Sequence, residues 1–178
     1  GTGPGQSHII ELYFDSISTE MSFSYGPAWL LDNRQTSVAI AYGLATFFAA
    51  FFLPQMGRIV DRYGPVRVLC VVIVGLTVTS LMFTFVTDWL AITVVFGLLR
   101  FLGQGSIMLA CVNMISQWFD RRRGFALGVM SLGFPLSMAV HPPICQWMIE
   151  DMGWRLSWVW LGGSTLILFL PFIILFLY

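Results

Sequence analysis

The sequence predicts an all-α membrane protein, a bundle of apolar helices that cross a lipid bilayer. Hydrophobic residues make up 57% of the 178 residues and charged residues only 10%, whereas an average soluble domain has roughly 25% charged residues. These apolar segments have few polar faces, so we expect lipid around the bundle. A spanning helix takes about 20 apolar residues, and five segments meet that length: 36–56, 67–87, 89–113, 124–148 and 154–177.

Residues 9–31 form a sixth candidate span, which is atypical because it contains Glu11, Asp15 and Glu20. Each acid costs about 3 kcal/mol near the bilayer centre, unless it faces the bundle interior or an interface. The segment is either an unusual first helix or a damaged leader on a truncated helix, and we favour the helix. Residues 1–8 read as a leader or disordered segment, and the start without Met predicts that the chain is a fragment.

Arginines are concentrated in two of the predicted connections, 57–67 and 118–124. Two spans separate these connections, so both lie on the same side of the membrane. The positive-inside rule makes that side cytoplasmic. We therefore expect an integral protein of the plasma membrane with both connections in the cytoplasm and lipid as its main partner. The tryptophans at 89, 118, 147 and 154 fall near predicted helix ends, where indole rings favour the interface.

The composition argues against several classes of function. The chain has no lysine and a formal net charge of zero, so a phosphate-binding lysine and a basic nucleic-acid surface are both absent. Cys70, Cys111 and Cys145 lie in apolar runs, which suits packing rather than a disulfide framework. No set of residues has catalytic-triad or metal-ligand character. We expect no cofactor, no metal site, no nucleic-acid partner and no enzymatic activity.

The connection 57–67 combines glycines, one acid and several arginines. Gly57 and Gly64 allow close backbone approach or a positive φ. Asp61 is placed to accept hydrogen bonds from Arg62 or Arg67, or to face a helix N-terminus. Contacts of this kind would hold one end of the bundle shut. An ordinary topology-setting loop is the alternative, but it does not explain the spacing.

Arg100 is the only ionised residue deep inside the five clear spans. A cation near mid-membrane is costly and usually functional. Arg100 therefore has three possible functional roles: it binds a carboxylate, it pairs with an acid that moves during transport, or it tunes a proton site. The structural alternative is that it only braces the bundle through backbone carbonyls. Tyr42, Gln104 and Asn113 are candidates to line the same cavity, or they bridge helices by ordinary hydrogen bonds.

The fifth span carries a histidine and a series of small residues. His141 either titrates near neutral pH or is satisfied by a backbone carbonyl. Small residues let helices approach closely, and proline kinks a helix. The run therefore indicates close packing, a hinge, or both, and its members are Gly124, Gly128, Gly133 and Pro135.

These motifs, in this order, resemble the major facilitator superfamily. Its loop between the second and third helices reads Gly-x3-Asp-Arg/Lys-x-Gly, as residues 57–64 do here, although Pro65 and Val66 depart from its later basic positions. The blocks 100–105, 118–128 and 153–155 are similar to the branch of monocarboxylate and oxalate/formate-type carriers. The resemblance covers about residues 24–170.

The resemblance implies that residues 9–178 are the N-terminal six-helix half of a twelve-helix carrier, two inverted three-helix repeats completed by the carrier's own C-terminal half. It implies alternating-access transport of a small organic anion, with a proton or by exchange, through a site at Arg100 and a cytoplasmic gate at Asp61. Animal members use a first-helix lysine that this chain lacks, so Arg100 would carry more of the recognition. The alternatives are a carrier of a neutral solute or drug, and a carrier-like receptor or scaffold.

Overall fold

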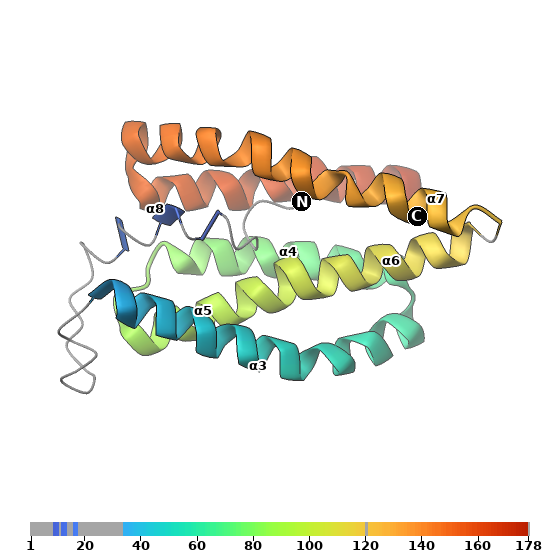
Figure 1. The fold of residues 1–178 in the computed structure, drawn as a ribbon, viewed down its shortest axis with the longest axis horizontal. Helices are drawn as coiled ribbons and strands as arrows, with labels where there is room; N and C mark the ends of the chain where they lie inside the picture. The colour runs from blue at the N-terminus through green and yellow to red at the C-terminus, as the bar shows by residue number, and fades with distance from the viewer. Residues whose placement is uncertain (1–8, 11, 14–15, 18–33, 120, 178) are drawn as a thin grey trace.

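Figure 1 shows the chain as a computed structural model, which describes residues 9–10, 12–13, 16–17, 34–119 and 121–177. All regular secondary structure in these ranges is helical, which confirms the all-α class. The elements are α3 (Arg34–Tyr63), α4 (Pro65–Phe83), α5 (Trp89–Leu99), the π-helix η1 (Arg100–Ser106), α6 (Ile107–Trp118), α7 (Arg123–Ser131) and α8 (Gly133–Leu177).

Within the described ranges, four helical runs are long and apolar enough to cross a membrane: Thr36–Tyr63, Pro65–Phe83, Trp89–Trp118 and Arg123–Leu175. The fourth contains 53 residues, which would extend about 80 Å if straight, against roughly 30 Å of hydrocarbon. Its chain reverses direction at Gly153, where φ is 80° (Figure 1). The sixth span expected at 9–31 lies mostly outside the described residues, so the six-helix count stays a prediction.

The connection expected at 57–67 is almost entirely helical. α3 continues through Arg62 to Tyr63, and α4 begins at Pro65. Gly64 alone makes the turn with a φ of 84°, and its N–H donates to the carbonyl of Val60 at 3.0 Å. Glycine adopts this left-handed conformation without strain, and proline suits the first position of a helix. Charged residues therefore lie on helix ends here rather than in a loop.

Two hydrophobic clusters fill the interior of the described structure. In the larger one, the ring of Phe83 lies 4.6 Å from Trp158 and 5.4 Å from Phe96, measured between centroids. The smaller one joins α3, α4 and α6 around Val60 and Val72. Through these clusters α4 packs on α8, and α3 packs on α5 and η1.

Two glycines allow these helices to approach closely. A Cβ atom added at Gly162 of α8 would lie 2.9 Å from the Cβ of Ser80 in α4. One added at Gly105 of η1 would lie 2.6 Å from a methyl carbon of Leu53 in α3. The contact at Gly162 also brings its carbonyl to the hydroxyl of Thr77, which donates to it at 3.3 Å. The contact at Gly162 therefore requires a residue without a side chain, whereas at Gly105 the end of the Leu53 side chain would have to move.

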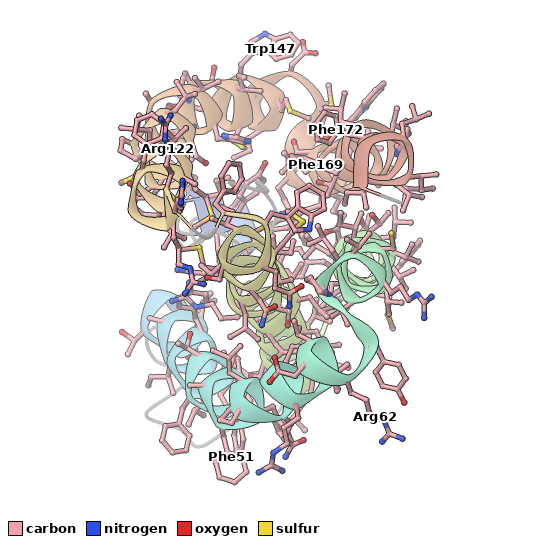
Figure 2. All side chains as sticks on the ribbon, turned by 90° about the vertical axis from the view of Figure 1, so that its right-hand side faces the viewer. Phe51, Arg62, Arg122, Trp147, Phe169 and Phe172 are labelled. Atoms are coloured by element: carbon pink, nitrogen blue, oxygen red, sulfur yellow. The ribbon has the colours of Figure 1, made fainter. Side chains whose placement is uncertain are left out.

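The two arginine-rich connections lie at the same end of the bundle (Figure 1), in agreement with the two spans counted between them. Figure 2 looks onto this end, with Arg62 on one side and Arg122 on the other. At the opposite end, Arg155 donates to the carbonyl of Thr84 and stacks over the ring of Trp154 at 4.4 Å. That contact joins the end of α4 to the turn in α8.

Large apolar side chains cover the outside of the bundle. Phe51 of α3 is 68% exposed and Trp147 of α8 is 61% exposed, and they project from opposite sides of the molecule (Figure 2). Soluble monomers rarely expose contiguous apolar patches of more than a few hundred Å². Together with the four long apolar runs, this surface identifies an integral membrane protein.

Adding one methyl group at Gly162 tests the close contact of α4 with α8. Alanine at either Gly162 or Gly163 gains about 1 kcal/mol of helix propensity, but only Gly163 has open space around its Cβ position. We expect Gly162→Ala to be less stable than Gly163→Ala by about 1–3 kcal/mol, because Ser80 would be overpacked. The free energy of unfolding in detergent micelles measures this, and equal stabilities would contradict it.

Candidate functional site

Arg100 lies near the middle of the helical run Trp89–Trp118, about 17 Å along it from Trp89. It opens η1, a π-helix of seven residues, and π-helical turns occur often at functional sites. The hydroxyl of Ser106 donates to the carbonyl of Phe101 at 2.7 Å, which ties the two ends of this widened segment together. The change in helix type therefore coincides with the cation.

The guanidinium of Arg100 is held between two of the predicted site residues. It donates to Oε1 of Gln104, and it lies over the ring of Tyr42, 5.3 Å from the centroid. The Tyr42 ring packs edge-on against Phe96, with 5.6 Å between centroids. A cation over an aromatic face is stabilised by the ring's quadrupole. The structure therefore brings Arg100, Gln104 and Tyr42 together across α3 and η1.

A cavity of about 140 Å³ lies between α3 and η1 beside this group. Its polar lining residues are Thr46, Arg100 and Gln104. The hydroxyl of Thr46 donates to the carbonyl of Tyr42 at 2.9 Å, which leaves its oxygen as an acceptor toward the cavity. The volume is small beside the 300–1,000 Å³ or so of a drug-sized pocket.

Asn113 is placed at the arginine-rich end instead of beside Arg100. Its side-chain amide donates to Oδ1 of Asp61 at 3.1 Å, and Gln117 donates to its carbonyl oxygen at 2.6 Å. Thirteen residues separate Asn113 from Arg100, about 20 Å of helix. The bond to Asp61 therefore joins the end of α6 to the end of α3.

Among the described residues, Asp61 accepts a hydrogen bond from Asn113, and no bond to it from Arg62 or Arg67 is formed. Arg62 is adjacent to it on α3, and neighbouring residues of a helix do not face each other. Arg62 instead stacks over Tyr63 at 5.5 Å from the ring centroid, and Arg67 is exposed on the first turn of α4. Gly57 lies against Leu109 of α6 at 3.9 Å from its Cβ position. The polar contact between α3 and α6 is an amide–carboxylate bond.

His141 lies on α8 and does not line the cavity at Arg100. Its Nδ1 atom lies 3.2 Å from both the hydroxyl and the carbonyl of Ser137, one turn earlier. The histidine is therefore satisfied within its own helix.

The glycines expected to pack helices on the fifth span have open surroundings. Nothing in the described structure lies within 4 Å of a Cβ position at Gly124 or Gly128. The helix is interrupted at Leu132, directly before Gly133 and Pro135, and Pro135 has no N–H to continue the ladder. Pro142 and Pro143, by contrast, remain inside α8 with helical backbone angles.

Several residues that line the cavities were not predicted from the sequence, among them Thr46 and Phe101. Thr46 follows Tyr42 by four residues, so helical spacing places both on one face of α3. Phe101 follows Arg100 directly but is apolar, and nothing in its type marks it. Gly103 and Gly105 are weak helix formers, and this local signal in the sequence could have pointed to the π-helical segment.

The long apolar helices, with Arg100 in the middle of one of them, define a polytopic integral membrane protein. A profile of the Major Facilitator Superfamily matches residues 14–178. The chain belongs to the major facilitator superfamily, which confirms the resemblance given by its motifs.

Curated relatives agree with this assignment. The chain is 27% identical over 136 residues to the MFS-type transporter hasB of Aspergillus fumigatus, covering 76% of this chain and 30% of the relative. It is 32% identical over 144 residues to the cis,cis-muconate transport protein of Acinetobacter baylyi (71% and 33%). It is 25% identical over 160 residues to monocarboxylate transporter 3 of Gallus gallus (88% and 27%). The chain thus spans a third or less of these relatives, and no solved structure matches it.

A double-mutant cycle tests the bond between α3 and α6. We expect Asp61→Ala and Asn113→Ala to be coupled by about 0.5–1.5 kcal/mol in unfolding free energy, the range for one hydrogen bond at a partly hydrated site. The control cycle replaces Arg62 instead of Asp61, and it should give no coupling with Asn113. Equal coupling in the two cycles would show that the Asp61 bond is not specific.

Proposed function

We propose that the chain is the N-terminal half of a secondary carrier for a small organic anion, and that Arg100 binds the anion. The observation that carries the proposal is the position of Arg100 beside a mid-membrane cavity, with its guanidinium held by Gln104 and Tyr42. A guanidinium is a planar set of donors that matches the two oxygens of a carboxylate. The residues around it suit a carboxylate better than a neutral solute.

The names of the relatives support an acid as the substrate. One is a cis,cis-muconate transport protein, and others are monocarboxylate transporters 3 and 4. A carboxylate is common to the ligands that these names state. The same group would meet Arg100 here.

The transport cycle we propose is alternating access. The six-helix half, built as two inverted three-helix repeats, rocks against the C-terminal half about the site at Arg100. The arginine-rich end is cytoplasmic by the positive-inside rule, in the plasma membrane. The Asn113–Asp61 bond closes α6 onto α3 at that end, and opening the cytoplasmic side requires it to stretch or break. The open faces of Gly124 and Gly128 leave room for the second half or for lipid.

Replacing Arg100 tests the proposal in vesicles that carry the transporter at the full length of its relatives. Arg100→Gln should raise the KM for a transported acid about 10- to 100-fold, the loss of one charge-assisted contact. The matched control is Arg155→Gln, since Arg155 contacts a backbone carbonyl and an indole ring at the far end. It should change protein abundance more than KM.

Saturable uptake of labelled acids that is indifferent to Arg100→Gln, at equal protein abundance, would contradict the proposal. Arg100 would then brace the bundle, and the neutral-solute alternative would replace the anion. Carrier-like binding without any accumulation would favour a receptor. Uptake rates in the same vesicles distinguish the two modes of coupling. An inward proton gradient accelerates uptake by a proton symporter, whereas an anion inside the vesicles accelerates uptake by an exchanger.

Cysteine labelling tests the orientation in the membrane. Tyr63→Cys and Asp88→Cys place exposed thiols at opposite ends of the bundle. A membrane-impermeant maleimide should label the Asp88→Cys variant in intact cells, and the Tyr63→Cys variant only after permeabilisation. The reverse pattern would place the arginine-rich end outside.

A further inference from the structure

A second and larger cavity, a groove of about 520 Å³, lies between α3 and α5. Ala45, 2% exposed, forms part of its floor with Gly97, whose Cβ position lies 3.7–3.9 Å from Ala45. Phe48 and Val94 form its walls and are 56% and 61% exposed. Small residues at the helix contact and large ones on either side therefore produce an apolar groove.

The groove adjoins the cavity at Arg100. Ala49 of α3 and Phe101 of η1 line both spaces. Phe101 follows Arg100 in the chain, is half-buried, and packs against the smaller hydrophobic cluster. The bond from Ser106 to its carbonyl fixes the backbone at this point. A charged cavity and an apolar groove thus lie side by side, with Ala49 and Phe101 between them.

We propose that the groove holds the apolar body of a substrate whose carboxylate binds Arg100, and that Phe101 limits the size of that body. This rests on the proposed function and extends it, because it names the substrate class as monocarboxylates of about six or more carbons with an unbranched aliphatic or flat aromatic body. A molecule that is charged at one end and apolar at the other matches the two adjoining spaces.

The two volumes decide between this class and the smallest acids. The 140 Å³ cavity takes the carboxylate and its first carbons, whereas the 520 Å³ groove has room for a longer apolar body. The groove offers few polar groups: Thr93 already donates to the carbonyl of Trp89 at 2.9 Å, and Gln55 is the other polar side chain in the lining. Burial of carbon is therefore the interaction available there.

The test measures how unlabelled acids inhibit the uptake of labelled butanoate. It uses vesicles bearing the full-length carrier, with protein-free vesicles to subtract diffusion. Each methylene that enters the groove should strengthen inhibition about fourfold. We expect this increase to continue from butanoate through hexanoate to octanoate.

Two matched variants locate the effect in the groove. Val94→Trp fills the groove from an exposed wall position, so inhibition should stop strengthening beyond butanoate. Leu90→Trp makes the same change one turn earlier on α5, outside the groove, at a residue that is 70% exposed; it should keep the normal series. Phe101→Leu makes the side chain smaller without leaving a large cavity in the core. It should therefore strengthen inhibition by branched acids relative to straight ones.

The outcomes separate this inference from the proposed function. Inhibition that does not change with chain length, while Arg100→Gln still raises the KM for butanoate, would overturn the inference alone. The groove would then be a site for lipid or for the C-terminal half. Equal behaviour of Val94→Trp and Leu90→Trp would do the same. Absence of saturable uptake of labelled butanoate and of labelled octanoate alike, or uptake indifferent to Arg100→Gln, would overturn both.

Discussion

The need to satisfy every backbone N–H and carbonyl without water governs this structure. In hydrocarbon an unsatisfied polar group costs several kcal/mol, so the chain crosses as helices and turns only near their ends. Gly64 and Gly153 make two of those turns with a positive φ, and Pro65 begins the next helix where no N–H is needed. The long apolar helices, and the connections of one or a few residues between them, follow from this requirement.

Helices in lipid have little hydrophobic drive to associate, so their contacts depend on close fit. Gly162 against Ser80 and Gly105 against Leu53 are fits of this kind. The same use of small residues produces the cavities. Ala45 and Gly97 let α3 and α5 touch, and the large side chains beside them then stand apart as the walls of the groove.

Placing the half-buried Arg100 in the middle of a span has an electrostatic cost, and nearby side chains offset it. Gln104 accepts from the guanidinium and Tyr42 offers its ring face, while the π-helix lies where these contacts are made. Arg155 shows a different use of arginine, since it fastens α4 to α8 through a backbone carbonyl. The contrast gives the two residues different expected roles and makes Arg155 a suitable control for Arg100.

The sequence by itself determined the all-α membrane class and the family, and it predicted the spanning segments from residue 36 onward and the mid-span position of Arg100. Hydropathy, length and motif order are local properties, and they can be read without knowing the partners of a helix. Tertiary structure decided which residues meet. It placed Asn113 beside Asp61 and added Thr46 and Phe101 to the cavity lining. It also placed the ring of His141 within hydrogen-bond distance of Ser137. The physical reason is that spans with little polar periodicity carry almost no signal for their rotation about their own axes, and that rotation selects the side chains that face one another.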